Sequence, residues 1–236
     1  LAEGALSATF VPVFSRALST QGETRAKELG RQALTLLIAI GFFVVCLGII
    51  LSPQLVSLIA PGFSGEEAAL AVSFTKRLFP FLLIISLSAL VMGVLNSLGS
   101  FFVPAVAPAV SNVVFIVVVL FFYEKFGISA LPVAVLAGGV SQFCVQWIWS
   151  AWKGFVLYPT KINRADDELK TMMRLFLPYV VGLSFNQLHP IISRVMGSFL
   201  EAGSISVLNY ADRLLQLPLG LFVIAISQAV LPTLSK

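Results

Sequence analysis

Residues 34–59 read LTLLIAIGFFVVCLGIILSPQLVSLI, and no charged side chain occurs anywhere between Gln32 and Gly65. A helix needs about 20 mostly apolar residues to cross a membrane, so this stretch is long enough to do so. The whole chain has the same character, because 58% of its residues are hydrophobic, only 11% are charged and the mean hydropathy is +0.98. A soluble domain carries roughly 25% charged residues. The sequence therefore predicts an all-α polytopic membrane protein.

Turn signals divide the other apolar stretches. Residues 78–123 carry no charge but are too long for one span, and the turn-forming NSLGS at 96–100, followed by Pro104, divides them into two helices. Further spans are predicted at 126–152, 169–199 and 205–234. The opening segment, 2–18, is helical in pattern but too short to cross alone. The prediction is six full transmembrane helices and one truncated helix.

Lysine and arginine gather in alternate connections, which orients the spans. One set holds Arg16, Arg25, Lys27, Arg31, Lys153, Lys161, Arg164, Lys170, Arg174 and Lys236, and the other holds Lys76, Arg77 and Lys125. Because positive loops stay in the cytoplasm, the larger set is predicted to be cytoplasmic. Glu66, Glu67 and Glu201 then face outward. Membrane topology thus explains the net charge of +4, and no nucleic-acid partner is predicted.

An internal repeat suggests two lobes. Residues 5–16 and 225–236 share an Ala-x-Ser, a proline and a final Ser–basic pair at a constant offset. Both copies end a helix on the predicted cytoplasmic side, as a parallel repeat about an axis along the membrane normal requires. The alternative is that there is no repeat, and that two unrelated helices end in a similar proline–serine–basic sequence. The repeat predicts a first lobe at 1–153 lacking its first helix, a basic cytoplasmic loop at 154–168, and the first two helices of a second lobe at 169–236.

Four polar residues of the last predicted span, Asn209, Asp212, Arg213 and Gln216, share one face of a helix. A charge in a span costs at least about 2.5–3.5 kcal/mol, so this face has to look into protein or water. In one interpretation, Asp212 and Arg213 simply hold neighbouring helices together. In the other, Arg213 binds an anionic head group and Asp212 orients it. A guanidinium group suits phosphate oxygens, which makes arginine the natural partner of a pyrophosphate.

The preceding span carries a second polar set around a proline. Its members are Ser184, Asn186, Gln187, His189, Ser193 and Arg194. Pro190 breaks the backbone hydrogen bonding there and exposes carbonyl groups that can line a cavity. Hydrogen bonding between helices is the other interpretation of this set. Glu3, in the opening segment, is a third ionisable residue within a predicted membrane helix.

No enzyme, metal or cofactor site is predicted. Cys46 and Cys144 both lie in long apolar runs, where thiols pack as small hydrophobic groups. The single histidine forms no Cys/His cluster, and the sequence has no phosphate-binding loop, nucleophile–base pair or paired carboxylates.

Several strings resemble motifs of the MurJ/MviN family, and the resemblance covers essentially the whole chain. They include AEGALS at 2–7, GVLNS at 93–97, GLSFNQ at 182–187 and NYADRL at 209–214. The resemblance implies a member of the multidrug/oligosaccharidyl-lipid/polysaccharide exporter superfamily, with two six-helix lobes around a cationic cavity. The implied activity is to flip lipid II, the lipid-linked peptidoglycan precursor, from the cytoplasmic to the outer leaflet of the bacterial inner membrane by alternating access.

The resemblance also implies residue roles. Asp212 and Arg213 match the family's essential Asp–Arg pair, and Glu3 matches its second-helix acid. The expected substrate-binding residues are Arg213, Asp212, Asn209, Gln216, Glu3, Asn186, Gln187 and Arg194. Ser193 stands where several relatives carry an acid that helps to bind sodium, which puts a sodium site of that type in doubt. Coupling to sodium, protons or membrane potential stays open, and no cofactor is expected.

The expected partners are a lipid-linked pyrophosphate glycan, membrane lipid and proteins that synthesise the cell wall. An exporter of other undecaprenyl-linked glycans or amphipathic drugs is one alternative function. A non-transporting scaffold that gathers cell-wall enzymes is another, and it predicts that charge-neutral changes along the polar face leave function intact.

Overall fold

The structure, a computed structural model, describes residues 2–163, 165–201 and 203–218. Its helices are α1 (Ala2–Gln21), α2 (Glu23–Ile50), α3 (Ser52–Ile59), α4 (Gly65–Ser97), α5 (Phe102–Phe126), α6 (Ala130–Trp152), α7 (Asp167–Phe185), α8 (Leu188–Gly197) and α9 (Ser204–Pro218). A single 3-10 turn, Gly127–Ser129, joins α5 to α6. These described residues contain no strand, and the all-α prediction is confirmed.

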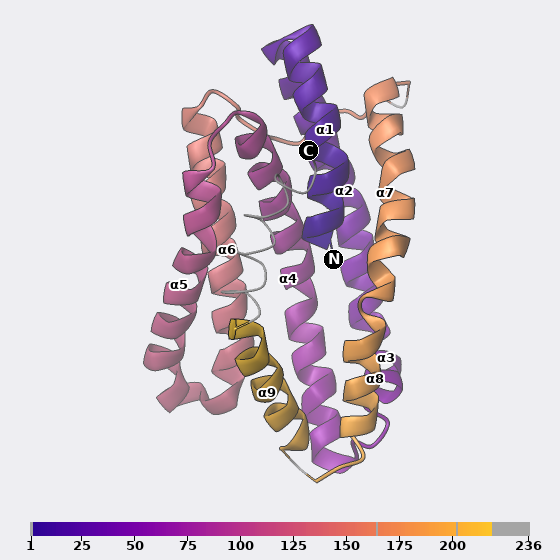
Figure 1. The fold of residues 1–236 in the computed structure, drawn as a ribbon. Coiled ribbons are helices and arrows are strands. Elements are labelled where there is room, and N and C mark those ends of the chain that lie inside the picture. The colour runs from indigo at the N-terminus through magenta and orange to yellow at the C-terminus, as the bar shows by residue number, and fades with distance from the viewer. Residues whose placement is uncertain (1, 164, 202, 219–236) are drawn as a thin grey trace.

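The long helices run lengthwise beside one another, as Figure 1 shows. The α1–α2 turn and the linker between α6 and α7, residues 153–166, both lie at the upper end in that view. The α5–α6 turn and the α8–α9 turn lie at the lower end. The described basic connections therefore share one end of the bundle, as their alternation predicts. That this end is cytoplasmic stays a prediction.

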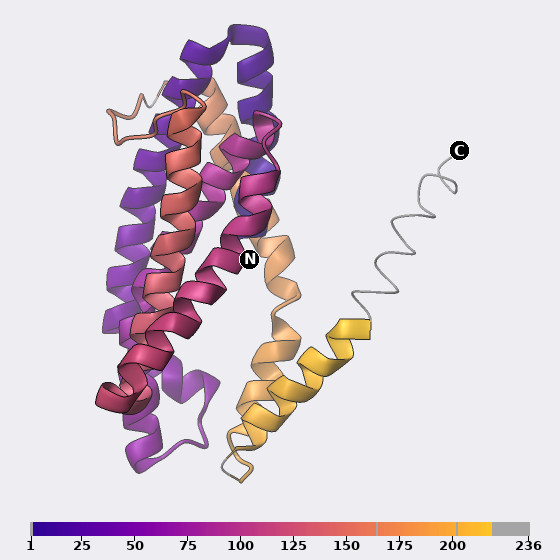
Figure 2. The ribbon, with the colours of Figure 1, turned by 90° about the vertical axis from the view of Figure 1, so that its left-hand side faces the viewer.

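Among the described residues, three helical stretches are long and apolar enough to cross a membrane: Glu23–Ile50, Gly65–Ser97 and Phe102–Trp152. The third folds back on itself at the 3-10 turn, so that α5 and α6 pack along each other (Figure 2). Helices α7 and α8 together make a possible fourth, bent by 43°. The chain is a multi-pass membrane protein. The count of six spans stays a prediction, because residues 219–236 of the last one lie outside the described residues.

Several predicted boundaries are wrong. The span at 34–59 is divided into α2, which begins earlier at Glu23, and α3, in which Pro53 occupies the first turn, where a missing N–H costs nothing. Helix α4 begins at Gly65 rather than at 78, and the acids Glu66 and Glu67 suit the positive end of its dipole. The opening helix, α1, extends to Gln21.

The predicted span at 169–199 is also divided, but not at Pro190. The break lies at Asn186 and Gln187, and Pro190 sits in the first turn of α8. In a continuous helix, Pro190 would leave the carbonyl of Asn186, four residues earlier, without its donor. The chain resolves this conflict by ending α7 one turn upstream of the proline.

The hydrophobic core joins α1, α2 and α4 to the linker and to the start of α7. Its buried members include Phe10, Phe14, Leu29, Leu90, Leu95, Phe155, Leu157, Leu169 and Met172. The Phe14 and Phe155 rings meet edge-on at 6.2 Å between centroids, which fixes the linker against α1. Helix α9, in contrast, turns away from the bundle (Figure 2) and exposes Val207 and Leu214.

Candidate functional site

The predicted polar face of α9 is helical and lies at the surface of the described structure. Asn209, Asp212, Arg213 and Gln216 all belong to α9, and all four are exposed. The amide of Asn209 donates to the carbonyl of Ile205, one turn earlier on the same helix, at 2.9 Å. The face thus exposes a carboxylate, a guanidinium group and two amides.

A small hollow between α8 and α9 brings three of the expected substrate-binding residues, Arg194, Asn209 and Asp212, together with Ser193. Its lining consists of Pro190, Ser193, Arg194, Ile205, Leu208, Asn209 and Asp212. Its volume of about 30 Å³ holds about one water molecule. Arg194 from α8 and Asp212 from α9 face this hollow, yet no ion pair within 4.0 Å joins them or Arg213 to any described partner.

The other predicted residues are not gathered in this hollow. Arg213 and Gln216 lie further along α9, outside the lining. Asn186 and Gln187 form the break between α7 and α8, where their backbone N–H groups donate to Leu183 and Ser184. The side chain of Glu3 and residues 219–236, with the second copy of the repeat, lie outside the described residues.

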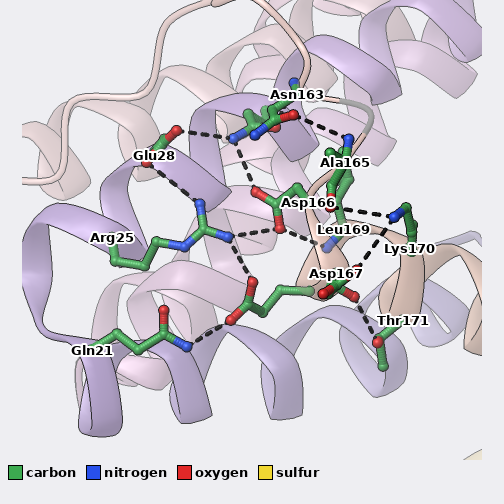
Figure 3. A network of polar contacts seen from close by, with 12 residues as sticks. Gln21, Arg25, Glu28, Asn163, Ala165, Asp166, Asp167, Leu169, Lys170 and Thr171 are labelled. Carbon is green, nitrogen blue, oxygen red and sulfur yellow. Dashed lines mark hydrogen bonds and ion pairs between the residues drawn. The ribbon is translucent and has the colours of Figure 1, made fainter.

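A polar cluster that the sequence analysis missed lies at the opposite end of the bundle (Figure 3). Nη2 of Arg25 donates to Oδ1 of Asp166 at 2.7 Å and to Oε2 of Glu168 at 2.6 Å, and Nη1 lies 3.4 Å from Glu28. Gln21 donates to the second oxygen of Glu168 at 2.6 Å. One cation therefore faces three carboxylates.

The buried centre of this cluster is Asp166, whose side chain has no exposed surface. Its second oxygen accepts a hydrogen bond from Gln32 at 3.1 Å, and its first also caps α7 by accepting from the backbone of Leu169 at 3.2 Å. The side-chain oxygen of Gln32, Oε1, in turn accepts from the backbone N–H of Asn163 at 2.9 Å. Three separate donors thus satisfy one buried carboxylate, as burial of a charge requires. We call Gln21, Arg25, Glu28, Gln32, Asp166 and Glu168 the Arg25 clamp.

Part of the clamp carries a sequence signal. Asp166, Asp167 and Glu168 stand directly before an apolar helix, and aspartate at an N-cap followed by acids in the first turn is a common helix start. That signal predicts the cap of α7. It does not predict Arg25, which lies 143 residues from Glu168 in the sequence.

Comparisons with known proteins agree over the whole chain. The family model described as "Lipid II flippase MurJ" matches residues 1–236. The lipid II flippase MurJ of Burkholderia cenocepacia is 35% identical over 100% of this chain and 47% of its own length. A structure of lipid II flippase MurJ in an inward closed conformation matches with a TM-score of 0.80 and 28% identity, over 98% of this chain and 47% of that one.

A more distant solved structure shows the same fold. It is a multidrug resistance MATE family transporter of the MOP superfamily in an inward-facing conformation, with a TM-score of 0.73 and 19% identity, over 92% of this chain and 50% of that one. The chain spans about half the length of the proteins it matches.

Proposed function

The chain belongs to the lipid II flippase MurJ family, and from this membership we propose that it forms about half of a transporter that moves lipid II across the bacterial inner membrane. The proposed direction is from the cytoplasmic to the outer leaflet. This function is transport rather than catalysis, so the residues that matter bind the substrate and let the protein change shape. Similarity to lipid II flippases along the entire chain is the observation that carries the proposal.

The physical problem is to move a pyrophosphate and a large sugar–peptide head group through a membrane that excludes charge. In the proposed mechanism, Arg213 binds the pyrophosphate through its planar guanidinium group. Asp212 orients Arg213, while Arg194, Asn209 and the other polar side chains of α7–α9 contact the head group. The prenyl tail stays in lipid. Rocking of two lobes then exposes the head group to either side, which shifts the protein between two pre-existing conformations.

The exposure of Arg213 on α9 fits this assignment. Among the described residues, no carboxylate lies within 4.0 Å of its guanidinium group, which is therefore open to a ligand in this part of the protein. The coupling ion is a separate proposal: with Ser193 beside the small hollow, we expect no sodium site built on an acid at that position.

The experiment uses the full-length protein in cells depleted of their own flippase, with lipid II on the outer leaflet as the readout. Wild type should restore exposure of lipid II, and Arg213→Ala should reduce it at least tenfold, which corresponds to about 1.4 kcal/mol of lost interaction. Arg174→Ala is the matched control, because Arg174 is also an exposed arginine but lies on α7 outside the polar face. A well-expressed wild type that exposes no lipid II would refute the proposed substrate. An active Arg213→Ala variant would refute the role of Arg213.

A further inference from the structure

The segment α7–α8 is tied to the earlier part of the chain at both of its ends. At the upper end in Figure 1, the Arg25 clamp binds the start of α7 to the α1–α2 hairpin. At the lower end, the backbone N–H of Gly62, between α3 and α4, donates to the hydroxyl of Ser198, just after α8, at 3.0 Å. The two ties differ in charge and in the number of contacts that hold them.

The upper tie is buried and redundant. Asp166 has no exposed surface and accepts from Arg25, Gln32 and its own helix, and the neighbouring Leu169 and Met172 are each only 5% exposed within the core. To open this tie, the protein would have to strip a buried carboxylate of its cation and expose two apolar side chains. Both changes are unfavourable, and they would have to occur together.

The lower tie is a single hydrogen bond at a close backbone approach. A Cβ atom at Gly62 would overlap the backbone carbonyl of Ser198, so only glycine allows this contact. Ser198 also donates to the carbonyl of Val195, so its hydroxyl keeps a partner when Gly62 leaves. A hollow of about 440 Å³, lined among others by Glu67 and Leu200, adjoins the contact. Water can therefore replace this bond at little cost.

Between the two ties, α7 has room beside α1. A hollow of about 450 Å³, lined by Thr9, Leu175 and Leu183 among others, follows the α1–α7 seam. A second hollow, of about 520 Å³, adjoins the clamp itself and shares Leu175 with the first. A Cβ atom at Gly182 of α7 would meet nothing within 4 Å. Helix α7 is thus held firmly at its start and loosely along its length.

We propose that the Arg25 clamp is a permanent anchor, and that the Gly62–Ser198 contact is the tie that opens when the transporter changes conformation. The first turns of α7 then move as one body with α1 and α2, and Arg25 is a positioning residue that sets where α7 pivots. The anchor lies at the predicted cytoplasmic end, so the contact that opens lies at the predicted outer end. This inference rests on the proposed function, because it assumes an alternating-access transporter.

Spin-label distances test the two ties independently of transport. In the full-length protein with Cys46 and Cys144 replaced by alanine, one label pair at Thr20 and Thr171 spans the upper tie. A second pair, at Glu67 and Leu200, spans the lower tie. All four positions are exposed, and each pair lines a shared hollow. Distances are measured by double electron–electron resonance in lipid nanodiscs.

We expect Gly62→Ala to lengthen the lower distance in most molecules and to leave the upper distance unchanged. Gly182→Ala is the matched control, since the added methyl meets open space, and both distances should stay as in the parent. Arg25→Ala should lengthen or broaden the upper distance, whereas Arg25→Lys, which keeps the charge, should largely restore it. An unchanged lower distance in Gly62→Ala, or an upper distance that lengthens with the lower one, would overturn the proposal.

Cross-linking then connects the ties to transport. A short thiol cross-linker between cysteines at Thr20 and Thr171 should leave lipid II exposure within about twofold of the unlinked protein, because an anchor does not open. The same cross-linker between cysteines at Glu67 and Leu200 should reduce exposure at least tenfold. Loss of transport on linking the upper pair would overturn the anchor. Failure of the unlinked parent to expose lipid II would count against the proposed function. The spin-label distances would still test which of the two ties opens.

Discussion

The Arg25 clamp and the polar face of α9 contain the same kinds of side chain in opposite surroundings. In the clamp, one arginine faces three carboxylates and every oxygen of the buried Asp166 has a donor. On α9, Asp212 and Arg213 are exposed, and the described structure gives neither an ion pair. Paired and buried charge holds helices in place in the clamp. The exposed charge on α9 is the part to which the proposed function assigns the substrate.

The hydrophobic core beside the clamp gives the largest expected effect on stability. Phe14 is fully buried between α1, α2 and the linker, so Phe14→Ala should destabilise the protein by about 3–5 kcal/mol through lost burial and a cavity. Thermal unfolding of the purified protein in detergent measures this loss. Leu214→Ala on α9 is the control, since Leu214 is 66% exposed in the described structure and its loss should cost far less. Equal losses of stability in the two variants would show that the core and α9 do not differ in how much their apolar side chains stabilise the protein.

Removing the cation of the clamp should have the next largest effect. Arg25→Ala leaves three carboxylates facing one another, one of them buried, and breaking a buried ion pair costs roughly 3–5 kcal/mol. We expect about 3 kcal/mol, at the lower end, because the Arg25 side chain is 22% exposed. Lys170→Ala, on α7, removes an exposed pair with Asp167 and should cost no more than about 0.5 kcal/mol. Similar melting temperatures for both variants would show that the buried ion pairs of the clamp stabilise the protein no more than an exposed pair does.

Neutralising the carboxylate of the clamp should cost less. Asp166→Asn keeps an oxygen that can cap α7 but loses the charge that Arg25 binds, so we expect a loss of about 1–3 kcal/mol. Asp167→Asn is the matched control, because the neighbouring carboxylate is 92% exposed and pairs only with Lys170. If the two variants unfolded at the same temperature, burial of Asp166 would not be the source of its contribution.

The sequence predicts the composition of these regions better than their contacts. The uncharged run at 34–59 predicts a membrane helix because hydrophobicity is local information, and the spacing of Asn209, Asp212, Arg213 and Gln216 predicts one helical face for the same reason. The division at Asn186 is only partly predictable, since Pro190 favours a break without fixing its place, and Pro178 lies inside α7 with no break. The Arg25 clamp is beyond local patterns, because its partners come from α2, the linker and α7.

The smallest expected effect on stability belongs to Arg213, and it sharpens the comparison most. Arg213 is exposed on α9 and forms no described ion pair, so Arg213→Ala should change the free energy of unfolding by no more than about 0.5 kcal/mol. The same variant is expected to lose lipid II transport while keeping its stability. Arg25→Ala, in contrast, is expected to lose stability. Thermal unfolding of both variants in one detergent, beside Arg174→Ala, measures the difference. If Arg213→Ala melted as early as Arg25→Ala, the guanidinium group on α9 would be a structural tie like that of the clamp, and its proposed contact with the pyrophosphate would have to be given up.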